Sequence, residues 1–115
     1  MLTFYYSTMN AGKTASLLAS SHNYRERDMK VMMLTSKIDT RSGIGKIVSR
    51  IGIESEAHPF DDKENLLSYL ESQSPETISC VFVDEAQFLT PEQVWQLSRF
   101  CDNHSIPVNC YGLRT

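Results

Sequence analysis

The residues with the clearest chemical potential are the eight from Ser7 to Thr14, Ser-Thr-Met-Asn-Ala-Gly-Lys-Thr. They follow a short β-prone run and precede a helical pattern, which is the position of a phosphate-binding loop (P-loop). In such a loop, backbone N–H groups and the N-terminus of the next helix bind phosphate oxygens. Gly12 lets the backbone approach the phosphates, the Lys13 ammonium reaches the β- and γ-phosphates, and the Thr14 hydroxyl ligates Mg²⁺. The usual pattern begins with glycine, and Ser7 stands in that place, which a backbone without positive φ tolerates.

A second group is acidic. Asp84 and Glu85 directly follow the apolar run Val81-Phe82-Val83. An Asp at the end of a buried strand is typical of the carboxylate that holds Mg²⁺ opposite the phosphates. Glu85 comes one residue later, where a carboxylate can orient or deprotonate an attacking alcohol. Alone, the pair is better explained as a solvated acidic turn; combined with the Lys13 loop, it favours a nucleotide site.

Both groups need a scaffold that carries them to one place. Apolar or β-prone runs predict strands at Leu2–Tyr6, Lys30–Thr35, Ile53–Phe60, Ile78–Val83 and Ile106–Tyr111. The segment Ile38–Gly52 is rich in Gly, Ser and charged residues and is expected to be a loop.

Helices are expected between these strands. The first runs over Gly12–Asp28, and its buried face is predicted to carry Ala11, Ala15, Leu18 and His22. The second is expected to be capped by Asp61, with Glu64 three residues later, and to end at Tyr69 or Leu70. The third should start with the capping sequence Thr90-Pro91-Glu92-Gln93 and end near Asn103.

Strands that alternate with helices predict an α/β fold in which right-handed crossovers join parallel strands and helices cover both faces of the sheet. Together with the phosphate-binding loop, this pattern predicts a P-loop NTPase (RecA-like) domain over residues 1–115. In open sheets of this kind the ligand lies at the carboxyl ends of the strands.

Composition excludes several other classes. The 115 residues carry a net charge of -3 without a clustered basic face, which argues against a broad contact with a nucleic-acid backbone. The cysteines Cys80, Cys101 and Cys110 form no CxxC pair and are expected to be buried, reduced side chains. The N-terminus does not have a signal-peptide pattern and no apolar run reaches membrane-spanning length, so a cytoplasmic protein is predicted.

Five ordered motifs together resemble the type II, or cellular-type, thymidine kinases, and the resemblance covers the whole chain. The motifs are the Ser7–Thr14 loop with Met9, Ile38-Asp39-Thr40-Arg41, Ser49-Arg50-Ile51-Gly52, Asp84-Glu85-Ala86-Gln87-Phe88-Leu89 and Tyr111-Gly112-Leu113-Arg114. The resemblance implies transfer of the γ-phosphoryl group of ATP to the 5′-hydroxyl of thymidine, with Mg²⁺, in nucleotide salvage.

The resemblance also implies residue roles. It makes Glu85 the catalytic base, Thr14 and Asp84 the Mg²⁺ residues, and Met9, Phe88 and Leu113 the lining of the thymidine pocket. The implied ATP-binding set is Ser7, Thr8, Met9, Asn10, Ala11, Gly12, Lys13, Thr14, Asp39, Arg41, Asp84 and Gln87. From the residues alone, Asp39 and Arg41 read as an exposed ion pair of little consequence.

Members of this family continue beyond the equivalent of Thr115, with a zinc-binding subdomain, a lasso-like loop over the thymine ring, and a tendency to form tetramers. The chain is therefore expected to be an N-terminal portion that binds ATP but phosphorylates thymidine weakly or not at all. Two alternatives stay open. One is a helicase-type ATPase, because Asp84-Glu85-Ala86-Gln87 resembles a helicase motif. The other is a non-catalytic nucleotide-binding fragment.

Overall fold

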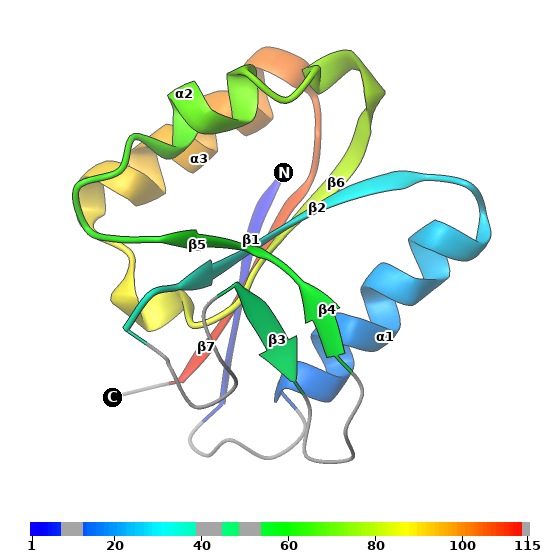
Figure 1. Cartoon of the computed structure of the whole chain (residues 1–115). Helices are drawn as coiled ribbons and strands as arrows, with labels where there is room; N and C mark the ends of the chain where they lie inside the picture. Colours follow the sequence, from blue (N-terminus) through cyan, green and yellow to red (C-terminus); the bar gives the residue numbers. More distant parts are fainter. Residues whose placement is uncertain (8–12, 39–44, 49–53, 114–115) are drawn as a thin grey trace.

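A computed structural model describes residues 1–7, 13–38, 45–48 and 54–113. Its centre is a five-stranded sheet with the order β1-β7-β6-β2-β5, in which all paired strands are parallel (Figure 1). These strands are β1 (Leu2–Ser7), β2 (Lys30–Ser36), β5 (His58–Phe60), β6 (Ile78–Val83) and β7 (Val108–Leu113). The remaining elements are α1 (Lys13–Glu26), the antiparallel pair β3 (Lys46–Val48) and β4 (Glu54–Glu56), α2 (Leu66–Glu71), the 3-10 turns η1 (Pro75–Thr77) and η2 (Ala86–Phe88), and α3 (Pro91–His104). The predicted α/β class with a parallel, helix-flanked sheet is confirmed.

The sheet has a core on each face, with α1 on one side and α2 and α3 on the other (Figure 1). Alternate residues of β6 point to opposite faces, so Val81 and Val83 join the core beneath α2 and α3, whereas Cys80 and Phe82 join the core beneath α1. This arrangement explains why β6 is apolar at consecutive positions: a strand covered on both sides has no polar face.

Helix α3 begins where the sequence predicts. The Thr90 side chain accepts a hydrogen bond from the backbone N–H of Gln93, and Gln93 Oε1 accepts one from the backbone N–H of Thr90, each at 3.1 Å. Gln93 does more than complete this capping box. Its Nε2 donates to the carbonyl oxygens of Asp61 (2.7 Å) and Glu64 (3.1 Å), and the residue is only 1% exposed. The loop before α2 is thereby attached to α3.

Replacing Gln93 by alanine is expected to lower the free energy of unfolding by about 2–4 kcal/mol, because the backbone groups of Asp61, Glu64 and Thr90 lose a partner in a partly buried site. Urea denaturation monitored by circular dichroism measures the change. The control is Gln73→Ala, since Gln73 Nε2 donates to the hydroxyl of its sequence neighbour Ser72 in an exposed hydrogen bond. Equal losses in the two variants would contradict a special role for Gln93.

The predicted buried face of α1 is wrong. Of that set only Leu18 is buried; Ala15 is half-buried, Ala11 lies outside the described residues, and the His22 side chain is 69% exposed, paired with Glu26 at 3.0 Å. The buried residues are Lys13, Leu17, Leu18 and Ser21. Two of these are polar, so apolar spacing alone did not identify the face.

Two other segments differ from expectation. The segment Ile38–Gly52 contains β3, which pairs with β4, and the predicted strand Ile53–Phe60 is two short strands, β4 and β5, in different sheets. Helix α2 is capped by Asn65, whose Oδ1 accepts from the backbone N–H of Ser68 at 3.0 Å. Asp61 instead accepts from the backbone N–H of Lys63, so it forms a turn and caps no helix.

Cys80, Cys101 and Cys110 are buried free thiols. Burial raises the pKa of Cys110 from 9.0 to about 12. Between these pH values the folded protein keeps a proton that the unfolded chain has lost. The contribution of the buried, protonated Cys110 thiol to the free energy of unfolding is therefore complete below pH 9 and is lost as the pH rises toward 12.

We expect the free energy of unfolding of the unsubstituted protein to fall more steeply above pH 9 than that of Cys110→Val, by up to about 1.4 kcal/mol per pH unit. Urea titrations at a series of pH values measure both slopes. Tyrosines that titrate in the same range are present in both proteins and cancel. Identical slopes would show that Cys110 ionises equally easily in the folded and unfolded chains.

Candidate active site

Lys13, Asp84 and Glu85 form a buried charged cluster at the carboxyl end of the sheet. Lys13 is the first residue of α1, and the two acidic residues directly follow β6. Lys13 Nζ lies 2.5 Å from Asp84 Oδ1 and 3.1 Å from Glu85 Oε1, although 71 and 72 residues separate them in the chain. The three residues are 5%, 4% and 2% exposed, respectively. The Lys13 ammonium thus faces two carboxylates in a site where all three described residues are shielded from water.

The backbone after β6 turns sharply to present both carboxylates. Asp84 still belongs to the sheet edge, because its N–H donates to the carbonyl of Leu34 at 2.8 Å. Glu85 has a left-handed backbone, with φ 58° and ψ 42°, which is uncommon for a residue with a side chain. The turn is held by Asp84 Oδ1, which accepts from the N–H of Glu85 at 2.9 Å, and by the N–H of Phe88, which donates to the Glu85 carbonyl.

Gln87 connects this turn to the neighbouring strand. Its Nε2 donates to Glu85 Oε2 at 2.5 Å, and its Oε1 accepts from the backbone N–H of Leu113, the last residue of β7, at 3.1 Å. The two carboxylate oxygens of Glu85 therefore receive hydrogen bonds from different elements, α1 and η2. Both ends of the Gln87 amide are engaged with groups of the protein itself.

A hollow of about 460 Å³ lies beside the cluster. It is lined by Tyr5, Tyr6, Ser7, Lys13, Ser16, Ser20 and Tyr111. The Tyr5 and Tyr111 rings stack at 4.8 Å, and burial is the largest cause that raises the pKa of Tyr6 and Tyr111. The Tyr6 and Tyr111 phenols are therefore neutral at pH 7 and can donate hydrogen bonds. The volume falls in the range of small-molecule sites.

The other predicted site residues are only partly described. Thr14, in the first turn of α1, is half-buried; Phe88, in η2, is 36% exposed; and Leu113 is half-buried at the end of β7. Thr8, Met9, Asn10, Ala11, Gly12, Asp39 and Arg41 lie outside the described residues.

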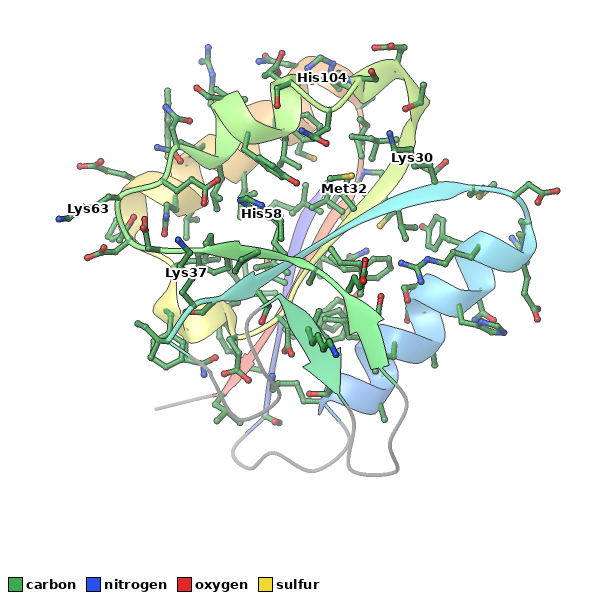
Figure 2. All side chains as sticks on the ribbon, in the orientation of Figure 1. Lys30, Met32, Lys37, His58, Lys63 and His104 are labelled. Carbon is green, nitrogen blue, oxygen red and sulfur yellow. The ribbon has the colours of Figure 1, made fainter. Side chains whose placement is uncertain are left out.

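Histidines and cysteines do not build a further centre in the described part of the chain. His58 Nε2 lies 2.6 Å from a carboxylate oxygen of Glu64, and His104 Nε2 lies 2.6 Å from one of Glu71. Figure 2 shows both rings on the side of the sheet that carries α2 and α3. Among the described residues, no three His, Cys, Asp or Glu side chains converge as a metal-binding group. In the same ranges no helix is both long and apolar enough to cross a membrane.

Comparison with known proteins decides the family. The sequence model of the thymidine kinase family matches residues 1–115. The chain belongs to the thymidine kinase family. It is 57% identical to a thymidine kinase of Rhodopirellula baltica and 56% identical to those of Haemophilus influenzae and Shewanella oneidensis, with 99% of this chain covered in each case.

The resemblance predicted from the ordered motifs is therefore confirmed. The chain spans 54% of the length of the Rhodopirellula relative and 60% of the other two. The thymidine kinase match places the Lys13, Asp84 and Glu85 cluster in a family of ATP-using enzymes.

Proposed function

We propose that this chain binds ATP and takes part in phosphorylation of the thymidine 5′-hydroxyl, giving dTMP for nucleotide salvage. One observation carries the proposal: the buried contact of Lys13 with Asp84 and Glu85 in a chain of the thymidine kinase family. A cation from the start of α1 beside two carboxylates from the end of β6 provides the groups that phosphoryl transfer requires.

ATP is proposed to bind through the Ser7–Thr14 loop, with Lys13 turned from the carboxylates toward the β- and γ-phosphates. The residues fit a magnesium ion, because the Asp84 carboxylate already faces a cation and hydroxyl and carboxylate oxygens are the ligands that Mg²⁺ prefers. Thr14 and Asp84 would hold this ion, and its charge would offset that of the phosphates. Asp39 and Arg41 remain further proposed ATP-site residues; the Gln87 amide, in contrast, is bonded to Glu85 and to the backbone of Leu113.

Glu85 is the proposed base. In the reaction, a bond forms between the thymidine 5′-oxygen and the γ-phosphorus while the bond from that phosphorus to the bridging oxygen of ADP breaks. The proton of the 5′-hydroxyl passes to a Glu85 carboxylate oxygen. Burial of Glu85, which is 2% exposed, excludes competing water and keeps the carboxylate in one position.

The nucleoside is proposed to lie against Met9, Phe88 and Leu113. The exposed Phe88 ring is available to an aromatic base, since stacking needs only an open face. By family, we further propose a cytoplasmic enzyme that assembles into tetramers, and a zinc-binding region in the part of the longer relatives that this chain does not match.

Two measurements test the function. Isothermal titration of the 115-residue chain with ATP and Mg²⁺ is expected to show binding. A radiolabelled phosphorylation assay is then run on the chain alone and on a fusion in which it replaces the matching part of the Haemophilus influenzae relative. Thymidine phosphorylation is expected in the fusion and to be much weaker in the chain alone. ATP hydrolysis that responds to single-stranded DNA and not to thymidine would instead favour the helicase-type alternative.

A further inference from the structure

We propose that Gln87 is a positioning residue for Glu85, and that Gly112 provides the space that this role needs. The inference rests on the proposed role of Glu85 as the base. It concerns the three residues Glu85, Gln87 and Leu113, which we name the base clamp. The clamp joins the turn after β6 to the end of β7 through a single side-chain amide.

The chemistry of the Leu113 contact fixes how the Gln87 amide is oriented. A backbone N–H can only donate, so the Gln87 atom 3.1 Å from it must be the oxygen. The NH₂ group then faces Glu85 Oε2, 2.5 Å away, where it can only donate. The β7 backbone thus determines that a donor, and not a second acceptor, faces the carboxylate. This orientation follows from the hydrogen-bonding pattern and not from the choice of amide flip.

Gly112 is the residue that lets Gln87 sit so close to β7. A Cβ atom on Gly112 would lie 3.0 Å from both the backbone nitrogen and Oε1 of Gln87, and 3.1 Å from a ring carbon of Tyr6. Contacts of 3.0–3.1 Å are tighter than nine in ten real Cβ contacts, so a side chain at 112 would push Gln87 and Tyr6 away by a few tenths of an ångström. Glycine at this position therefore favours the close approach of Gln87 to β7.

The clamp does not depend on the phosphates. Lys13, which also donates to Glu85, is proposed to turn toward ATP when the nucleotide binds, and this would weaken its hydrogen bond to Oε1. The donor from Gln87 is anchored to the protein backbone and stays in place. Because Glu85 has a left-handed backbone that alone does not fix its side chain, a retained donor keeps the carboxylate directed at the reacting hydroxyl.

The first test detects the hydrogen bond from Gln87 to Glu85 without an enzyme assay. In NMR spectra of the 115-residue chain, the Gln87 side-chain NH₂ signal is assigned by its loss in Gln87→Met. We expect its protons to be shifted downfield and to exchange slowly, relative to those of Gln73. Gly112→Ala should weaken both effects, whereas Asn109→Ala, on the same strand but bonded to Cys80 Sγ, should not. Gln87 signals like those of Gln73 would overturn the clamp.

The second test separates positioning from ATP binding. In the thymidine kinase fusion, Gln87→Met is expected to lower kcat by about 10- to 100-fold while the Kd for ATP changes less than about twofold. Gln87→Glu keeps an acceptor for the Leu113 N–H but replaces the amide donor to Glu85 with a second carboxyl group. It should lose as much turnover as Gln87→Met, although a purely structural link to β7 would be preserved.

The outcomes are distinguishable. A rise in the Kd for ATP with unchanged kcat would make Gln87 an ATP-binding residue and overturn the positioning role. Wild-type kcat in Gln87→Glu, with loss only in Gln87→Met, would reduce Gln87 to a structural link. An unsubstituted fusion that cannot phosphorylate thymidine would contradict the proposed function itself, and the positioning inference would fall with it.

Discussion

Replacing Lys13 by methionine is expected to weaken ATP binding by at least about 100-fold, because the phosphates lose a charge-assisted donor of the kind worth several kcal/mol in a buried site. The same change should destabilise the free protein by about 3–5 kcal/mol. Lys13 is 5% exposed and is the cation between two buried carboxylates, so its loss leaves both charges without this partner. Isothermal titration measures the binding, and urea denaturation measures the stability.

The two effects can be separated with a second substitution. Adding Asp84→Asn to Lys13→Met removes one of the two carboxylate charges that have lost Lys13, so stability should recover in part while ATP binding stays weak. The matched control is Lys30→Met, because Lys30 is an exposed lysine whose Nζ contacts Gln73 and Thr77 far from the site. If the control lost as much ATP affinity as Lys13→Met, a general charge effect would explain the result and the specific phosphate contact would be refuted.

The parts of the structure that local chemistry controls were predictable from the sequence. The cap of α3 needs only residues 90–93, and both of its hydrogen bonds are present. Strand β6 is an apolar run in the sequence, and the structure buries it on both faces. The meeting of Lys13 with Asp84 and Glu85 was also predictable, although 71 and 72 residues intervene. Parallel strands bring their carboxyl ends to one edge, and each group follows such an end.

The parts controlled by distant partners were not predictable. Asp61 and Asn65 are equally good caps by type, and the choice between them is made from α3. There, Gln93 holds the carbonyl of Asp61, and Gln96 Oε1 accepts the N–H of Leu66, 30 residues away. The face of α1 was missed for a related reason: Lys13 is buried because it meets the carboxylates of β6, a contact that helical periodicity does not encode.

Within the candidate site, Gln87 was predicted from the sequence as a site residue, but its contacts were not. Its contacts depend on Leu113, 26 residues further along the chain, and on the absence of a Cβ at the preceding residue Gly112. The strand predicted from the sequence ended at Tyr111, whereas the structure has Gly112 inside β7, a position that often marks a close approach of another group. The roles of Gln87 and of the other site residues therefore stay predictions, to be decided by substitution.

Replacing Glu85 by glutamine is expected to lower kcat for thymidine phosphorylation by about 10²- to 10⁴-fold while ATP affinity is largely kept. The amide has nearly the shape of the carboxylate and can adopt the same left-handed backbone, but it cannot take the proton of the 5′-hydroxyl. The Lys13 contact with Asp84 remains, so the phosphate side of the site is preserved. Turnover in the fusion and isothermal titration of ATP measure the two quantities together.

Stability gives this prediction a further check. The Glu85 carboxylate accepts from Lys13 on one oxygen and from Gln87 on the other. A glutamine at this position has one oxygen, so its NH₂ group must face either Lys13 or Gln87, and a modest loss of about 1–3 kcal/mol follows. Glu92→Gln is the control, because Glu92 is an exposed carboxylate in the first turn of α3 and should leave kcat and stability nearly unchanged. Full turnover in Glu85→Gln would remove Glu85 as the base and leave Asp84 as the carboxylate to test next.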